Sequence, residues 1–271
     1  MSVPPPVVVC FSGSDPSCGA GLQADLLALA AWGCHPATIV TTLTVQNTVG
    51  VTQLMPIPVE LLRAQTACLI DDLPVAAFKI GLIGSTDHID VLAEFLSRHP
   101  LVPVVLDPVL ASGRGDPLLA EDARAALRER LLPYTTVLTP NTLELARLSG
   151  LPADTACERR AGARALIAAG SRHVLVTGTH ARTDHVENVL FAADGREYAG
   201  IWPRLAHSFH GSGCTLAAAL AAALAHGHAV PEAASMAQAY TYQALRHAYR
   251  PGHGQWIPDR LLGRRPALTH A

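Results

Sequence analysis

Short apolar runs alternate along the chain with segments in which apolar residues recur at helical spacing. The apolar runs are typical of strands buried in a parallel sheet, and they cover residues 7–11, 37–43, 76–80, 102–106, 136–138 and 173–176. The helical segments cover about 22–32, 58–70, 87–98, 121–131, 141–149, 158–169, 214–227 and 231–248. This alternation predicts an α/β fold, in which a mostly parallel sheet carries helices on both faces.

An antiparallel part is predicted late in the sheet. Residues 186–191 and 197–202 flank Asp194-Gly195, which is a hairpin signal, and residues 53–55 are a candidate for a short extra strand. No internal repeat or linker divides the chain, so we expect one domain over residues 1–271. The tail from Pro251 is rich in Pro, Gly and Arg, and we expect it to be poorly ordered.

The stretch from His210 to Thr215 opens the Ala-rich helix near the end of the chain. The first N–H groups of a helix have no internal partner and carry partial positive charge, so Gly211, Ser212 and Gly213 predict an anion cradle. Cys214 follows at its mouth, where we expect the pKa of the thiol to fall. The alternative is a glycine-rich helix cap with a buried cysteine.

Ligands of such sheets bind beyond the carboxyl ends of the strands, so one cleft can use residues from several strand exits. The segments at these exits are 13–21, 46–47, 81–82, 107–115, 141–144, 178–180 and the start of the Cys214 helix.

Polar side chains at these exits are candidate ligand contacts. Asp25, in the first helix, either stabilises the helix start or accepts hydrogen bonds from a ligand hydroxyl or amine. Gln46 either shapes a turn or pairs with the edge of a heterocycle. Asp107 follows a buried strand, a position that favours a metal-linked role. Asn141 and Glu144 fit a helix capping box, or else Glu144 orders water around Mg²⁺.

Composition and charge exclude several classes of function. The formal net charge is −2, which gives no broad basic surface for nucleic acid. The N-terminus has no basic region typical of a signal peptide, and no apolar run reaches the roughly 18 residues of a membrane helix. Six scattered cysteines without metal-ligand spacing predict a reduced, cytoplasmic protein. Lys79 is the only lysine.

The motifs that the chain lacks narrow the chemistry further. There is no GxGxxG, no HExxH and no GxSxG, which argues against a dehydrogenase, a metal-cluster enzyme and a Ser–His–Asp hydrolase. Phosphoryl transfer asks mainly for positioning and charge stabilisation, so it fits the candidate residues best.

In combination, the motifs resemble those of the hydroxymethylpyrimidine and phosphomethylpyrimidine kinases of thiamine biosynthesis, in the ribokinase superfamily. The resemblance runs from Phe11 to about Ala225 and rests on seven motifs in order. These are GSDPS with GAGLQAD from Gly13 to Asp25, VQNT with Gly50-Val51, Lys79-Ile80-Gly81, Asp107 with Val109, GDPLL at 115–119, Thr139-Pro140-Asn141 with Glu144, and HGSGCTL at 210–216.

This resemblance implies a ribokinase-like three-layer α/β/α sandwich and a set of roles. The activity it implies is transfer of the ATP γ-phosphoryl group to 4-amino-5-hydroxymethyl-2-methylpyrimidine and then to the monophosphate. Cys214 matches the presumed base, and Gly211, Ser212 and Gly213 match the anion hole. The implied substrate contacts are Gly13, Ala20, Asp25, Gln46, Leu82 and Val109. The implied ATP contacts are Asn141, Thr177, Gly178, Gly211 and Gly213, with Asp107 and Glu144 for Mg²⁺.

Three positions depart from the family pattern. Cys18 replaces a usual Gly, Leu82 replaces a frequent Met, and Thr177 stands where the family has a Lys near the phosphates. We therefore expect ATP affinity to be reduced, unless another cation such as Arg114 compensates. The loop 112–117 is predicted to close over the phosphates as a lid.

Two other functions stay open at this point. Pyridoxal also offers a hydroxymethyl group on an aromatic nitrogen ring, so a pyridoxal or pyridoxine kinase is one alternative. A non-catalytic pyrimidine-binding protein of the same fold is the other, supported only by Thr177. The resemblance also implies a homodimer.

Overall fold

The computed structural model describes residues 3–111, 118, 121–180 and 183–263. Its strands form a single sheet in the order β3-β2-β1-β4-β5-β6-β7-β8-β9. The strand bounds are β1 Val7–Ser14, β2 His35–Gln46, β3 Val51–Pro56, β4 Val75–Ile80, β5 Val104–Leu106, β6 Val137–Leu138, β7 His173–Thr177, β8 His185–Ala192 and β9 Glu197–Pro203.

The middle of the sheet is parallel and its two edges are antiparallel. Strands β2, β1, β4, β5, β6 and β7 run parallel to one another, whereas β3 pairs antiparallel with β2, and β8 pairs antiparallel with both β7 and β9. Strand β1 is apolar on both faces because both are covered: Val9 and Phe11 face one core, and Val8 and Cys10 face the other.

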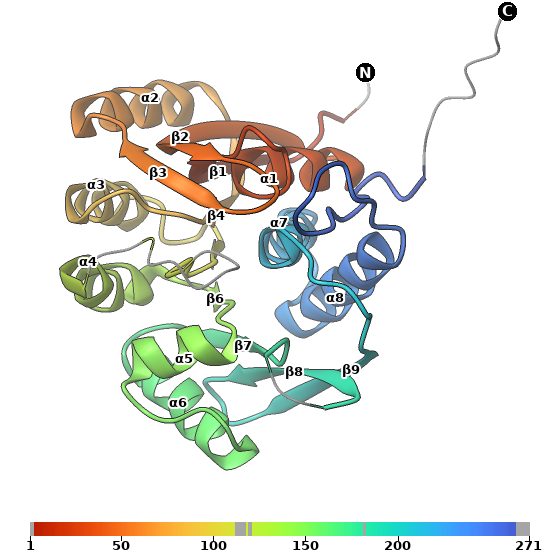
Figure 1. The fold of residues 1–271 in the computed structure, drawn as a ribbon. Helices are drawn as coiled ribbons and strands as arrows, with labels where there is room; N and C mark the ends of the chain where they lie inside the picture. The colour runs from red at the N-terminus through yellow and green to blue at the C-terminus, as the bar shows by residue number, and fades with distance from the viewer. Residues whose placement is uncertain (1–2, 112–117, 119–120, 181–182, 264–271) are drawn as a thin grey trace, which may run out of the picture.

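Helices cover both faces of the sheet, which gives three layers (Figure 1). One face carries α1 Gly21–Ala31, α7 Ser212–Ala225 and α8 Val230–Arg246. The other carries α2 Val59–Asp72, α3 Thr86–Ser97, α4 Glu121–Ala126, α5 Thr142–Ser149 and α6 Ala156–Ala168. The predicted α/β sandwich is confirmed.

Helix α7 lies at the centre of its layer. Its residues from Ala217 to Ala223 have no solvent-exposed surface, and it packs against α1, α8 and the middle of the sheet. Small alanine side chains on every side allow this close approach. The N-terminus of α7 is thereby fixed beside the carboxyl ends of β1, β4 and β5.

Most predicted elements form within a few residues of their expected bounds, with two differences inside the sheet and helices. Strand β2 is longer than predicted and continues to Gln46, because its residues 42–46 pair with residues 51–56 of β3. The predicted helix 121–131 is α-helical only to Ala126 and continues as a π-helical turn over Leu127–Leu131.

The prediction of a poorly ordered tail from Pro251 is wrong for residues 251–263. Ile257 and Arg260 in this segment are each 2% exposed, and backbone hydrogen bonds join it to residues 48, 208, 210, 244 and 249. The Pro, Gly and Arg content is typical of a segment exposed to solvent, but Arg260 is buried and donates to backbone carbonyls instead. The predicted lid at 112–117 lies outside the described residues.

None of the helices in the described ranges is long and apolar enough to cross a membrane. All six cysteines are unpaired, which agrees with their scattered spacing in the sequence.

Candidate active site

The loops that leave the carboxyl ends of the central strands meet the N-terminus of α7. Gly13 at the end of β1 packs against Leu82 after β4, since a Cβ atom on Gly13 would lie 2.9 Å from Leu82 Cδ2. Gly21, the first residue of α1, has φ +60° and lies so close to the carbonyl of Gly13 that a Cβ atom would stand 2.3 Å from it. These glycines therefore let two of the predicted substrate segments touch.

A buried ion pair lies beneath these loops. The ammonium of Lys79 on β4 donates to Asp25 Oδ2 on α1 at 2.9 Å, and both side chains are 0% exposed. Burial raises the pKa of Asp25 to about 6, although the charge and hydrogen bond of Lys79 oppose the rise. Asp25 Oδ1 is buried and has no hydrogen-bond partner among the described residues, so it can accept a bond from a ligand.

Asp15 organises the loop between β1 and α1. Its Oδ1 accepts from the backbone N–H and the hydroxyl of Ser17, and its Oδ2 accepts from Ala20 N–H, all at 2.8 Å. His210 Nε2 lies 2.8 Å from both Asp15 Oδ2 and the side-chain amide of Gln46. The loop before α7, the loop before α1 and the end of β2 are therefore joined through one imidazole.

Cys214, in the first turn of α7, contacts groups of three other elements. Its thiol lies close to the carboxylate of Asp107, which follows β5, and to the backbone N–H of Gly21. The prediction of a lowered thiol pKa is wrong. Burial raises the pKa of Cys214 to about 12, and Asp107 and Asp25 add to the rise against the opposing charge of Lys79. The helix terminus does not outweigh this loss of solvation.

Glu144 and Asp107 form a buried carboxylate pair. Burial and the nearby charge of Asp107 raise the pKa of Glu144 to about 8. Burial also raises the pKa of Asp107, against the opposing charge of Lys79. Asp107 Oδ2 is buried and has no hydrogen-bond partner among the described residues. Two buried carboxylates, close enough for the charge of Asp107 to raise the pKa of Glu144 against the opposing charge of Arg147, are a favourable place for a cation.

Mg²⁺ is a cation that fits these residues. It prefers oxygen ligands and binds through one or two protein carboxylates together with water and substrate phosphates. In the described part of the chain, no three His, Cys, Asp or Glu side chains gather as a closed metal site. An open site on Asp107 and Glu144 that is completed by a phosphate is compatible with both observations.

The N-terminus of α5 lies next to this pair. Asn141 Oδ1 accepts from the N–H groups of Leu143 and Glu144 at 2.9 Å, and Glu144 Oε2 accepts from Asn141 N–H at 2.9 Å. The predicted capping box is therefore present. Asn141 also bridges to Thr177 at the end of β7.

Gly178 follows Thr177 in a tightly packed position. A Cβ atom there would lie 2.2 Å from the carbonyl of Glu187, and its N–H donates to Asn188 Oδ1 at 3.1 Å. This close contact with β8 is enough to explain why a glycine occupies the position.

Val109, two residues after Asp107, is half-buried, and its N–H donates to the Asp107 carbonyl.

The residues of the predicted cradle form the start of α7. Gly211 is the N-cap with φ +81°, and Ser212 begins the helix. A Cβ atom on Gly213 would lie 3.7 Å from Asp107 Oδ1, so the first turn of α7 faces the carboxylate pair.

The structure thus gathers the predicted residues around one edge of the sheet, and it adds others that sequence reasoning missed. Asp15, Lys79 and His210 lie in motifs that carry the family resemblance, but the sequence alone assigns them no role. Arg260 and the buried hydroxyl of Ser12 gave no signal at all.

Comparisons with known proteins agree on one family. The sequence profile of the family described as phosphomethylpyrimidine kinase matches residues 15–259. A hydroxymethylpyrimidine/phosphomethylpyrimidine kinase of Streptomyces coelicolor is 41% identical over 253 residues, which are 93% of each chain.

Solved structures of vitamin kinases share the fold. The ADP complex of Bacillus subtilis pyridoxal kinase is 29% identical, with a TM-score of 0.86 over 94% of this chain and 97% of that one. The complex of Staphylococcus aureus pyridoxal kinase with AMP-PCP and pyridoxal is 26% identical, with a TM-score of 0.87 over 97% and 96%.

Proposed function

This chain belongs to the phosphomethylpyrimidine kinase family, and we propose that it transfers the γ-phosphoryl group of ATP to 4-amino-5-hydroxymethyl-2-methylpyrimidine and then to its monophosphate. The product of the two steps is the diphosphate used in thiamine biosynthesis. The observation that carries this proposal is the 41% identity over 93% of both chains with a kinase of that name.

The pyrimidine site we propose lies over the buried ion pair. In this proposal the unpartnered oxygen of Asp25 accepts a hydrogen bond from an exocyclic amino group, and the bond from Lys79 favours the ionised carboxylate. Gln46 offers an amide to the edge of the ring, held in place by His210. The remaining contacts are apolar or backbone groups of Gly13, Ala20, Leu82 and Val109.

Phosphoryl transfer is proposed to occur at the start of α7. The backbone N–H groups from Gly211 to Gly213 stabilise the negative charge on the transferred group. The hydroxymethyl oxygen attacks the γ-phosphorus, the bond to the β-phosphate oxygen breaks, and ADP leaves. The hydroxyl proton passes to the sulfur of Cys214 as the thiol gives its own proton to Asp107, so no free thiolate is required.

ATP is proposed to lie between α5, the end of β7 and α7. Asn141, Thr177 and Gly178 are the contacts on the nucleotide side, and Asp107 and Glu144 would hold Mg²⁺. When bound, the ion neutralises charge on the phosphates.

A homodimer is also proposed. Strands β2 and β3 expose Leu43, Val45 and Met55, which are 44%, 57% and 55% exposed. Exposed apolar side chains on the two outermost strands at this side of the sheet support association with a second copy. Light scattering after size-exclusion chromatography tests this, and Val45→Asp should shift a dimer towards the monomer.

The activity itself is tested by product analysis with ATP, Mg²⁺ and the hydroxymethylpyrimidine. Mass spectrometry should detect the monophosphate first and the diphosphate later. Monophosphate alone would restrict the chain to the first step. Pyrimidine binding without any product would favour the non-catalytic binding protein instead.

A further inference from the structure

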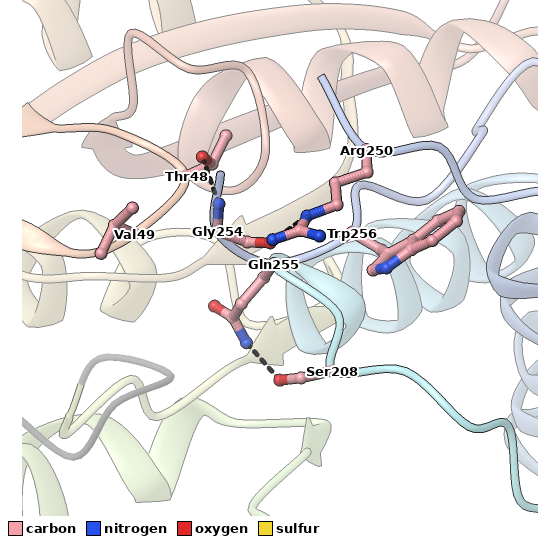
Figure 2. Close-up of a pocket in the computed structure, with 7 residues that line it drawn as sticks. All are labelled: Thr48, Val49, Ser208, Arg250, Gly254, Gln255 and Trp256. Atoms are coloured by element: carbon pink, nitrogen blue, oxygen red, sulfur yellow. Dashed lines mark hydrogen bonds between the residues drawn. The ribbon is translucent and has the colours of Figure 1, made fainter. Parts of the chain in front are cut away.

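Residues 249–263, here called the C-terminal segment, lie across the loops that build the site. Gln255 N–H donates to the Thr48 carbonyl at 2.9 Å, beyond the end of β2. His210 N–H, just before the anion cradle, donates to the Trp256 carbonyl at 2.8 Å. Figure 2 shows the segment between Thr48 and Ser208, where it borders a surface cavity of about 340 Å³. The segment therefore contacts both sides of the proposed pyrimidine site.

Arg260 is the buried centre of these contacts. Its guanidinium Nη2 donates to the Gly19 carbonyl at 2.5 Å and lies 3.5 Å from the Gly211 carbonyl, while Nη1 donates to the Cys18 carbonyl at 3.3 Å. Its Nε donates to Thr215 Oγ1 at 3.0 Å. One planar group thus bonds the loop before α1 and the first turn of α7 together.

The two backbones that Arg260 joins are in tight contact. A Cβ atom on Gly211 would lie 1.9 Å from the Gly19 carbonyl. In the same loop, Cys18 has φ +58°, a conformation that costs energy for a residue with a side chain. The loop is therefore held against the cradle by bonds from outside it, and Arg260 supplies bonds to Cys18, Gly19 and Gly211.

Every hydrogen bond of Arg260 goes to an uncharged oxygen, although the side chain is only 2% exposed. Burial of a charged group on neutral acceptors is unfavourable by itself, and burial lowers the pKa of Arg260. These bonds hold the loop before α1 in a fixed position relative to the first turn of α7. The positive charge of the guanidinium lies beside the N–H groups that are proposed to bind phosphate.

We propose that Arg260 is a positioning residue for phosphoryl transfer: its guanidinium fixes the acceptor loop at Cys18–Gly19 against the anion cradle at Gly211–Thr215. This inference rests on the proposed function. Misplacement of reacting groups by about 1 Å costs on the order of a hundredfold in rate, so loss of this link should appear in catalysis.

The test compares Arg260→Ala with Arg250→Ala. Arg250 belongs to the same segment, but among the described residues its guanidinium bonds only the carbonyls of His253 and Gly254 of that segment. Arg260→Ala should lower kcat/KM for the pyrimidine by about tenfold to a hundredfold, and Arg250→Ala by less than about threefold. Unchanged kcat/KM in folded Arg260→Ala would overturn the proposal.

A second readout separates positioning from general damage to the fold. A cavity of about 410 Å³ reaches Arg260 between Trp32, Tyr240 and Leu261, so a small guanidinium compound can enter the space that Arg260→Ala leaves. Millimolar methylguanidinium should restore activity to Arg260→Ala and leave Arg250→Ala unchanged. Arg260→Lys keeps the charge without the fork of donors, and we expect it to remain impaired. Full activity of Arg260→Lys, or no rescue, would contradict the proposal.

Hydrogen–deuterium exchange tests the link without activity, in case the wild-type chain phosphorylates no pyrimidine. Peptides that cover 16–22 and 209–216 should exchange faster in Arg260→Ala than in Arg250→Ala. If Arg260→Ala does not fold, Arg260→Lys takes its place in this comparison. Equal exchange in both variants would overturn the positioning role, whatever the reaction proves to be.

Discussion

The ammonium of Lys79 lies 2.9 Å from a carboxylate oxygen of Asp25, and neither side chain has any exposed surface. The pair joins the middle of the sheet to the first helix, directly below the candidate active site. It also explains why the single lysine of the chain occupies a strand interior, where an unpaired ammonium would be strongly unfavourable.

Replacement of Lys79 by Met should destabilise the protein by about 3–5 kcal/mol, because it leaves the Asp25 carboxylate buried without its partner. Pyrimidine affinity should fall as well, since Asp25 would then take up a proton. Urea denaturation and isothermal titration measure the two effects. The double variant Lys79→Met/Asp25→Leu removes both charges, and it should regain part of the stability but none of the affinity. A double variant no more stable than Lys79→Met would contradict this account of the pair.

Cys214→Ser should reduce turnover by about tenfold or more while pyrimidine affinity stays within about twofold. The hydroxyl keeps a similar volume and a position beside Asp107 but releases its proton less readily than a thiol. Steady-state kinetics and isothermal titration give the two values. Equal losses of turnover and binding would assign Cys214 a structural role only.

Thr177→Lys should improve ATP affinity by about tenfold, because it places an ammonium at the end of β7 beside the proposed phosphate site. Thr177→Met is the matched control, since it lengthens the side chain without charge and should give no gain. Nucleotide titration distinguishes them. If the wild-type chain already binds ATP as tightly as Thr177→Lys, another cation has replaced the missing one.

The pKa of Glu144 makes the stability of the protein depend on pH. This carboxyl has a pKa of about 8 in the fold against 4.5 ordinarily, so the folded state holds its proton more tightly than the unfolded state. Stability from this group is complete below about pH 4.5 and is lost as pH rises through about 8, on the order of a few kcal/mol. Urea denaturation from pH 5 to 9 should show the decline in the wild type and a smaller one in Glu144→Gln. An identical decline in both would rule out Glu144 as its source.

Cys18→Gly should stabilise the protein by on the order of 1 kcal/mol, because Cys18 is held at φ +58° in an exposed loop. Thermal unfolding measures the change. Cys68→Gly, at another exposed cysteine but inside α2, should instead be destabilising. A loss of stability in Cys18→Gly would mean that the side chain makes contacts that matter more than the backbone strain.

The fold could be predicted from sequence because its signals are local. Strand β1 is continuously apolar and helix α7 is rich in alanine, so their own residues indicate that each element is covered by other parts of the chain on all sides. The end of β2 was underestimated because its polar residues are paired with β3, which is a contact outside the segment.

Much of the site's chemistry depends on contacts between residues distant in sequence. Lys79 and Asp25 are 54 positions apart, and Arg260 is 241 positions from Gly19, so no local pattern shows that they meet. The predicted pKa of Cys214 failed for a related reason. The helix terminus is visible in the sequence, whereas the burial and the Asp107 carboxylate that outweigh it are not.

The most direct test of the proposed function is the ratio of kcat/KM for the hydroxymethylpyrimidine to kcat/KM for pyridoxal, measured with ATP and Mg²⁺ in the same coupled assay. Asp25, with its free buried oxygen, and Gln46 are expected to favour the aminopyrimidine, so the ratio should be well above one. A ratio below one would contradict the pyrimidine assignment and make the chain a pyridoxal kinase of the same fold.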